Sequence, residues 1–335
     1  MRATIFAGAL AIFAHSSAHA ADTKIRFTLD WKLQGVHAWY YLAQSKGYFK
    51  KEGLDVSIDQ GQGSAATITR IMSGAYDAGF GDMNAIIQNA ATKPDSAPVM
   101  VYQIYNQPPF AVLTTASGPV KSLKDIEGRT IGAPPGSAST KLFPALAKAA
   151  GFDAGKATII SIKPNLQEQM LIQGRVDASL VFNVTSYMNI LGQKKDPDKD
   201  FRWFPYGASG LDIYSNGVMV SKALAKNNPK AVKGLVAAIN KAVQEVIANP
   251  SEGLKIIKAV EPLINSDLEG KRLQFALKNL ILSQESKKNG IGAVDMARLQ
   301  KSIGVIKGLY SLPKAPAAAD VFSPAFLPPR QERNL

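Results

Sequence analysis

A short sequence pattern that occurs twice constrains the fold of this chain more than any other feature. The pattern Gly-x-x-Asp-Ala runs from Gly74 to Ala78 and again from Gly174 to Ala178. Around each copy we predict the same order of elements: strand, loop, helix, strand, a helix that ends at the glycine, and an apolar strand that ends in asparagine. Strands that alternate with helices predict an α/β chain with mostly parallel sheets, and the two copies predict two lobes of similar plan.

The segment from Lys24 to Val56 carries the first candidate binding residues. An apolar run with strand-like alternation, residues 25–29, is followed directly by Asp30 and Trp31. A helix rich in aromatic side chains is predicted over residues 36–46, and a second strand over residues 55–58. Ligands of open α/β sheets bind beyond the carboxyl ends of strands, so we expect Asp30 and Trp31 to face a cleft.

Residues 1–20 have the features of a secretory signal peptide. Arg2 supplies a positive charge, residues 3–13 are apolar, and residues 18–20 have the small-x-small form of a cleavage site. The apolar run is too short to span a bilayer, and a membrane anchor through it is the weaker alternative. The chain has 335 residues and no cysteine, so we expect neither disulfides nor a lipid-modified cysteine; the combination is typical of a soluble protein of the bacterial periplasm.

The rest of the chain is predicted to consist mainly of helices, and the predicted elements divide it between the two lobes. Ser64 is predicted to cap a helix over residues 65–73, and Pro229 to begin a long helix with an apolar stripe. Further helices are predicted over residues 251–260, 267–283 and 295–310, followed by an extended, proline-rich end from residue 311. The predicted division is a signal peptide over 1–20, lobe one over 21–107 together with 214–335, and lobe two over 108–213.

The reactive side chains favour binding over catalysis. His37 is the only histidine after residue 20, and without cysteine the chain can form no Cys/His metal site and no Cys-His nucleophile. It has no Gly-x-Ser-x-Gly elbow, no Gly-x4-Gly-Lys-Ser/Thr loop and no dinucleotide fingerprint. We therefore expect no catalytic residue, no metal and no cofactor. The net charge of +13 is spread over scattered lysines and arginines, which favours a solvated basic surface over a nucleic-acid partner.

Candidate binding residues come from a helix start, from aromatic side chains and from strand ends. Ser137 and Ser139 follow Gly136 at a predicted helix start, where unpaired N–H groups favour an anion, although helix capping explains the serines equally well. Trp31 and Tyr40 offer flat faces to a ligand, with core packing as the alternative, and for His37 a structural role is slightly favoured. The polar residues at strand ends and crossings are Asp82, Asn84, Asn183, Asp212 and Asn216, each a common turn residue when taken singly.

At these residues the chain resembles the periplasmic binding proteins of ABC importers. The resemblance rests on Leu29-Asp30-Trp31, on His37-Ala38, on residues 43–56 and on the later stretch 211–217, and it covers nearly the whole mature chain. The group it resembles most closely binds thiamine-pyrimidine precursors, near the nitrate, taurine and aliphatic sulfonate binders. The resemblance implies a two-lobed type II periplasmic binding protein fold with two hinge strands. It also implies a monomer that encloses a small molecule and docks on a membrane ABC permease.

The resemblance leaves the ligand open. In the pyrimidine binders the positions of Asp30, Trp31 and His37 line the site, but those proteins usually continue with Thr/Phe-Pro-Asn where this chain has Lys32-Leu33-Gln34. In sulfonate and taurine binders a segment similar to Gly136, Ser137, Ala138 and Ser139 holds the anion. The crossing that contains Asp212, Tyr214 and Asn216 is expected to line the same cleft. Related fungal enzymes of pyrimidine synthesis carry a cysteine-rich motif that this chain lacks, which counts against an enzyme.

The expected function is therefore that of a periplasmic receptor for a pyrimidine or related aromatic compound. The first alternative is a receptor for a sulfonate, taurine, nitrate or aromatic carboxylate anion. The second alternative, of another class, is an enzyme of thiamine-pyrimidine biosynthesis.

Overall fold

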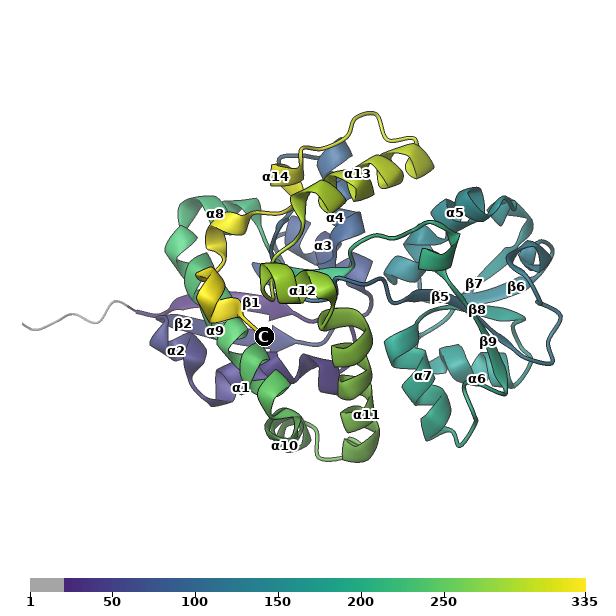
Figure 1. Cartoon of the computed structure of the whole chain (residues 1–335), viewed down its shortest axis with the longest axis horizontal. Coiled ribbons are helices and arrows are strands. Elements are labelled where there is room, and N and C mark those ends of the chain that lie inside the picture. The colour runs from purple at the N-terminus through teal and green to yellow at the C-terminus, as the bar shows by residue number, and fades with distance from the viewer. Residues whose placement is uncertain (1–20) are drawn as a thin grey trace, which may run out of the picture.

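The computed structural model describes residues 21–335, and the predicted signal peptide lies outside the described residues. The chain forms two α/β lobes, each built on a five-stranded sheet (Figure 1). The sheet of lobe one has the order β2-β1-β3-β10-β4, and that of lobe two the order β7-β6-β8-β5-β9. The strands of lobe one are β1 (Thr23–Thr28), β2 (Leu54–Asp59), β3 (Ala78–Asp82), β4 (Val99–Gln103) and β10 (Asn216–Val220). Those of lobe two are β5 (Phe110–Thr115), β6 (Thr130–Ala133), β7 (Thr158–Ser161), β8 (Ala178–Phe182) and β9 (Phe201–Pro205).

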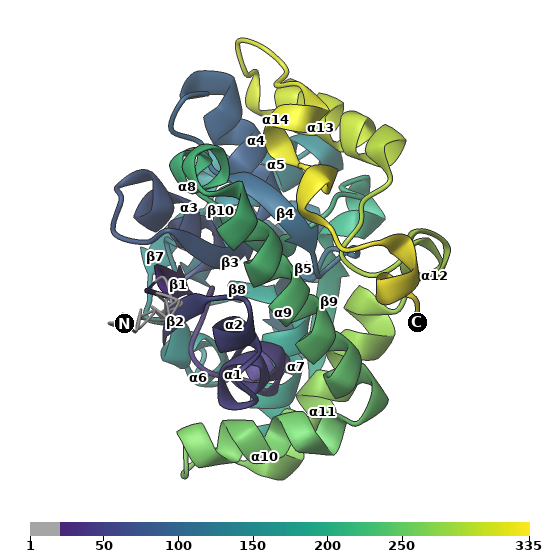
Figure 2. The same cartoon turned by 90° about the vertical axis from the view of Figure 1, so that its left-hand side faces the viewer.

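Helices surround both sheets, and most of them belong to lobe one. Lobe two carries α5 (Ala138–Ala150), α6 (Gln167–Ile172) and α7 (Asn183–Gly192). Lobe one begins with α1 (Ala38–Ser45), α2 (Tyr48–Lys51), α3 (Ser64–Met72) and α4 (Met83–Thr92). After the return crossing it adds α8 (Lys222–Asn227), α9 (Pro229–Ala248), α10 (Pro250–Val260), α11 (Ser266–Ala276), α12 (Gln284–Asn289), α13 (Met296–Tyr310) and α14 (Ala318–Val321). Figure 2 shows the long helix α9 running across the outer side of lobe one.

The repeated pattern has the same structural role in both lobes, which confirms the prediction of two lobes of similar plan. In lobe one the Asp77 carboxylate accepts the N–H of Arg26 at 2.9 Å, and the Asp77 N–H donates to the Arg26 carbonyl at 3.0 Å. In lobe two Asp177 makes the same two bonds to Thr130, at 2.9 and 2.8 Å. Each aspartate therefore sets its strand against the neighbouring parallel strand. Gly74 and Gly174, the first residues of the two patterns, have φ of 75° and 67°. This left-handed conformation ends the helix that precedes each glycine.

Four strands of each sheet run in the same direction, as expected of a mostly parallel sheet, but the sheets are mixed because one strand in each runs against the others. Strand β10 pairs antiparallel with both β3 and β4, and β5 pairs antiparallel with both β8 and β9. These are the strands by which the chain enters a lobe from the other one. Each enters from the edge where the other strands end, so it has to run in the opposite direction.

Two other expectations differ from the structure in the second half of the chain. The helix predicted over residues 267–283 ends at Ala276 and continues as a π-helical turn, Leu277–Ile281. The end of the chain is not simply extended, because it contains α14 and buries Phe322 at 1% exposure. Ser323 donates its N–H to the Met100 carbonyl at 2.9 Å, so this segment covers the edge strand β4.

The apolar core is continuous from one lobe to the other on one side of the molecule. Side chains of α3, α4 and α13 in lobe one pack in the same buried cluster as those of α5, β5 and β8 in lobe two. Figure 1 shows α13 and α5 on this side, and α11 beside α7 on the other. Among residues 21–335, no helix is long and apolar enough to span a membrane.

Asp82 is a buried carboxyl group of lobe one that should make the stability of the protein depend on pH. Its side chain caps α4 by accepting the N–H groups of Asn84 and Ala85, and burial raises its pKa to about 7. An unfolded aspartate has a pKa of about 4, so between pH 4 and 7 the folded protein binds the additional proton. Stability from this group therefore falls as the pH rises through that window, by at most about 1.4 kcal/mol for each pH unit.

We expect Asp82→Asn to keep the cap and to flatten the fall in stability between pH 4.5 and 7, measured by urea unfolding at each pH. Asp295→Asn is the matched control, because Asp295 caps α13 but is only partly buried. Backbone N–H groups of Arg298 and Ala297 lower the pKa of Asp295, so its contribution is constant above pH 5. An unchanged pH slope in Asp82→Asn would contradict the buried, protonated aspartate.

Candidate functional site

A cavity lies between the lobes where the strands of both sheets end. About 320 Å³ of space lies between its wall atoms, and this figure includes space that is open to solvent. Its walls are Asp30, Trp31 and Ser64 from lobe one, and Ser137, Gln167, Phe182 and Thr185 from lobe two. A ligand in this cavity would therefore contact both lobes at once.

Within residues 21–335, Asp30 is the only charged side chain in the cavity wall, and two neighbours hold it in place. It follows β1 and is 6% exposed. The Asn216 side chain donates from Nδ2 to Asp30 Oδ2 at 2.7 Å, and His37 Nε2 lies 2.8 Å from Oδ1. The Gln34 N–H donates to His37 Nδ1 at 3.1 Å, so the proton of a neutral His37 lies on Nε2 and is donated to Asp30. Both ring nitrogens of His37 are thus used within the protein.

Each lobe adds an aromatic side chain and hydrogen-bonding groups to the cavity. Trp31 and Phe182 are partly exposed and come from opposite lobes, so they can contact a flat ligand from two sides. Ser137 precedes α5 but its hydroxyl makes no capping bond. Thr185 Oγ donates to Gln34 Oε1 at 3.3 Å, which joins the lobes at the cavity wall. These groups can accept or donate hydrogen bonds without adding charge.

The starts of helices α3 and α5 meet each other across the cleft. The Gly136 carbonyl accepts the N–H groups of Ala65 and Ala66, both at 3.2 Å, and the Ala138 N–H donates to Ser64 Oγ at 3.3 Å. These backbone N–H groups are the ones that would otherwise bind an anion. In this arrangement they close the cleft. Ser64 is the first residue of α3 and not its cap, which corrects the sequence prediction.

The backbones come this close only because glycine stands on both sides. A Cβ atom on Gly63 would lie 2.0 Å from the Gly136 carbonyl oxygen, and Gly63 has a φ of 145° that other residues rarely adopt. A Cβ on Gly136 would lie 3.0 Å from both Ala66 Cβ and the Gln62 carbonyl. Larger residues at either position would hold the lobes apart.

The structure brings some of the predicted site residues together at the cavity and places the others elsewhere. Asp30, Trp31 and Ser137 line the cavity; His37 and Asn216 hold Asp30; Gly136 and Ala138 form the contact between the lobes. Tyr40 is fully buried in the core, and Ser139 donates to the Val181 carbonyl at 2.8 Å. Asp82 and Asn84 lie buried at the start of α4, where Asn84 Nδ2 donates to the Tyr214 carbonyl at 2.7 Å. Asn183 faces a separate groove beside Tyr187 and Trp203.

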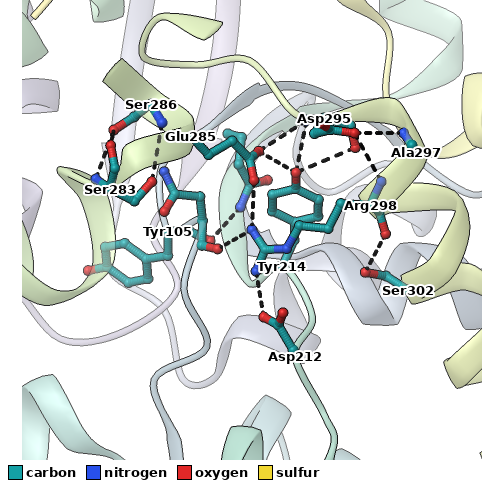
Figure 3. Close-up of polar contacts among 12 residues, drawn as sticks. Tyr105, Asp212, Tyr214, Ser283, Glu285, Ser286, Asp295, Ala297, Arg298 and Ser302 are labelled. Atoms are coloured by element: carbon teal, nitrogen blue, oxygen red, sulfur yellow. Dashed lines mark hydrogen bonds and ion pairs between the residues drawn. The ribbon is translucent and has the colours of Figure 1, made fainter. Parts of the chain in front are cut away.

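Asp212 and Tyr214 belong to a polar cluster at the two crossings between the lobes (Figure 3). Arg298 on α13 donates to the Asn106 carbonyl on the first crossing and to Asp212 Oδ1 on the return crossing, both at 2.8 Å. Its guanidinium lies over the Tyr214 ring, 4.3 Å from the centroid, and donates to Glu285 at 2.9 Å. Tyr214 donates its hydroxyl to the same Glu285 carboxylate. Asp212 is largely exposed, and neither residue lines the cavity.

Four wall residues were absent from the residues predicted to bind. These are Ser64, Gln167, Phe182 and Thr185. Phe182 is the last residue of β8, so the strand-end rule that selected Asp30 and Trp31 would have found it. Ser64 was recognised only as a cap. Gln167 and Thr185 lie in the first turns of α6 and α7 and carry no comparable signal.

Comparison with known proteins gives one family and several relatives. A family model described as NMT1/THI5 like matches residues 34–253. The 4-amino-5-hydroxymethyl-2-methylpyrimidine phosphate synthase THI13 of Saccharomyces cerevisiae is 27% identical over 260 residues, 75% of each chain. The formylaminopyrimidine-binding protein of Halalkalibacterium halodurans is 24% identical over 300 residues, 89% of each chain. The alkanesulfonate-binding protein SsuA of Xanthomonas axonopodis pv. citri, solved with bound MOPS, superposes with a TM-score of 0.66 at 16% identity, covering 91% of this chain and 99% of that one. These neighbours confirm the predicted periplasmic binding protein fold.

The contact at Gly136 predicts a variant that opens the cleft. Gly136→Ala places a methyl group 3.0 Å from Ala66 Cβ, so the lobes have to separate slightly, whereas the separated lobes accommodate the methyl freely. We expect a larger radius of gyration by small-angle X-ray scattering. Gly304→Ala on α13 is the control, because nothing beyond the backbone of its own helix lies within 4 Å of its Cβ position. Identical scattering of Gly136→Ala and the parent would show that this contact does not limit closure.

Proposed function

The chain belongs to the NMT1/THI5-like family, and from this premise we propose that it is a receptor for a small nitrogen-containing ring of the pyrimidine class. The observation that carries the proposal is the cavity wall as the described part of the chain forms it: an anchored carboxylate is its only charge, and each lobe supplies an aromatic side chain. A carboxylate accepts hydrogen bonds from ring or amino N–H groups, and flat apolar faces suit an aromatic ring. The relative that binds a formylaminopyrimidine supports this class.

The polar contacts of the cavity argue against an anion as the ligand. Among the wall residues that the structure describes there is no lysine or arginine, and a sulfonate or nitrate would lie beside the Asp30 carboxylate. Three N–H groups at the starts of α3 and α5, those of Ala65, Ala66 and Ala138, donate to Gly136 and Ser64 instead. The sulfonate-binding neighbour therefore supports the fold but not the ligand.

The contacts of His37 favour a receptor over an enzyme of pyrimidine biosynthesis. His37 is 1% exposed, and both of its ring nitrogens are engaged by Asp30 and Gln34. A general acid or base needs to reach the substrate, and this histidine does not line the cavity. The synthase relatives share the family at 27% identity, so their activity is the competing hypothesis to test.

The wider setting follows from the same proposal. Residues 1–20 would be removed as a signal peptide, and a monomeric receptor would work in the periplasm and deliver its ligand to an ABC permease. Lobe one would comprise residues 21–107 and 214–335, and lobe two residues 108–213. Asp30, Trp31, Ser64, Ser137, Gln167, Phe182 and Thr185 would contact the ligand directly.

Ligand screening tests the proposed class. We expect 4-aminopyrimidines to raise the melting temperature, since a ligand at 100 times its dissociation constant stabilises the folded protein by about 2.7 kcal/mol. Methanesulfonate, taurine and nitrate should have no effect at the same concentrations. Prolonged incubation followed by NMR of the ligand should show no conversion. Stabilisation by the anions alone, or turnover of the pyrimidine, would overturn the proposal.

Two variants test the wall residues by isothermal titration calorimetry with the best pyrimidine. Asp30→Asn should weaken binding about 10- to 100-fold, because a hydrogen bond to a charged acceptor is worth about 1.5–3 kcal/mol. Trp31→Ala should also weaken binding, through the lost ring contact. Asp59→Asn, at the exposed end of β2, is the control and should bind as the parent does. Unchanged affinity in both wall variants would place the site elsewhere.

A further inference from the structure

Helix α11 carries a buried ion pair that contacts both walls of the cavity. Arg272 Nε donates to Glu269 Oε2 at 2.9 Å, and the two side chains are only 2% and 7% exposed. Buried arginine and glutamate are rare without a specific need, because removing two charges from water costs several kcal/mol per ion. Neither Arg272 nor Glu269 is among the residues that line the cavity, so contact with a ligand does not explain why the pair is buried.

Glu269 holds the lobe-one wall. Its Oε2 accepts the Gly35 N–H at 2.7 Å. Gly35 lies in the short loop between Trp31 and His37, and a Cβ atom there would lie 2.4 Å from the Glu269 carbonyl oxygen. The loop therefore packs directly against α11, and this close approach requires glycine at position 35. Through this loop Glu269 fixes the segment that presents Trp31 to the cavity.

Arg272 holds the lobe-two wall from the same helix. Its Nη1 donates to the carbonyls of Val184 and Thr185 at 2.9 and 2.8 Å, and its Nη2 to Asn189 Oδ1 at 3.0 Å. These acceptors lie on α7, whose first turn supplies Thr185 to the cavity. Together with the two bonds to Glu269, these contacts use every N–H of the guanidinium. Separation of the lobes along α7 would leave Arg272 without its interlobe acceptors.

From these contacts we propose that the Arg272–Glu269 pair positions both walls of the cavity and draws the lobes together before any ligand is bound. Arg272 and Glu269 are positioning residues, since neither reaches the cavity. The proposal rests on the proposed function for its effect on affinity, but its effect on lobe closure does not depend on the ligand. Closure without ligand increases apparent affinity, because the binding-competent form is then populated in advance.

A double variant separates positioning from simple folding. Arg272→Met alone would leave the Glu269 charge buried and unpaired, which is strongly destabilising. Arg272→Met combined with Glu269→Gln removes both charges and keeps an acceptor for Gly35, so folding stability should stay near that of the parent. The matched control is Lys255→Met with Glu252→Gln on α10, an exposed pair with the same i,i+3 spacing and the same distance of 2.9 Å.

Lobe closure can be measured directly by single-molecule energy transfer. The chain has no cysteine, so Lys233→Cys on α9 and Lys124→Cys in lobe two, both exposed, accept a dye pair specifically. We expect the ligand-free double variant to shift toward low energy transfer, while the control matches the parent. With the best pyrimidine, the dissociation constant of the double variant should rise about 10-fold, equivalent to about 1.4 kcal/mol. Arg272→Lys, which keeps the charge but offers fewer donors, should shift in the same direction by less.

The outcomes distinguish this inference from the proposed function. Unchanged energy transfer in the ligand-free double variant overturns the inference, and so does a fall in melting temperature with no change in closure, since the pair would then serve folding alone. If no pyrimidine binds the parent, the proposed function fails while the ligand-free measurement still decides the inference. Should the double variant not fold, Arg272→Lys is judged by the same ligand-free criterion.

Discussion

The structure depends most on the hydrogen bonds that hold the Asp30 carboxyl group in a nearly closed space. Asp30 is 6% exposed and needs donors to compensate for lost water. His37 supplies one from the start of α1, and Asn216 supplies another from the first residue of β10. The Asn216 carbonyl in turn accepts the Tyr105 N–H at 2.7 Å, on the first crossing. One buried charge thus ties together the end of β1, the loop before α1 and both connections between the lobes.

Helix starts serve here to join the lobes. Helices α3 and α5 begin on opposite sides of the cleft, and each has N–H groups that no residue of its own helix can accept. Gly136 and Ser64 accept three of them across the cleft, which is possible because Gly63 and Gly136 carry no side chain to keep the backbones apart. The segment 136–139 at the start of α5, which suggests an anion site in the sequence, therefore forms a polar contact between the lobes. Whether this segment binds an anion or lobe one depends on where lobe one lies.

Local rules predicted the fold of each lobe and three of the seven wall residues of the cavity, and tertiary context determined the rest. The repeated aspartate, Asp77 or Asp177, could be recognised because its bonds join elements close to it in the pattern. Asp30 and Trp31 followed from their place after a strand. The direction in which a side chain points was harder to predict. Asp212 also lies at a crossing between the lobes, but it accepts a hydrogen bond from Arg298, 86 residues away in the sequence. The antiparallel strands β5 and β10 were missed because periodicity gives a strand but not its direction.

The two sides of the interface between the lobes differ in a way that suits a receptor. On the side of α5 and α13 the contact is apolar and continuous with the core. Around the cavity and at α7 the lobes are also joined by hydrogen bonds, including those from Arg272, beside the apolar contacts of Val184 and Tyr187. Polar contacts exchange with water at a net gain of only about 0.5–1.5 kcal/mol each, so they can break without unfolding the protein. A ligand in the cavity would contact Asp30 and Trp31 on one lobe and Phe182 and Thr185 on the other only when the lobes are closed. It would therefore bind the closed arrangement more tightly than the open one, and this difference in affinity shifts the equilibrium toward closure.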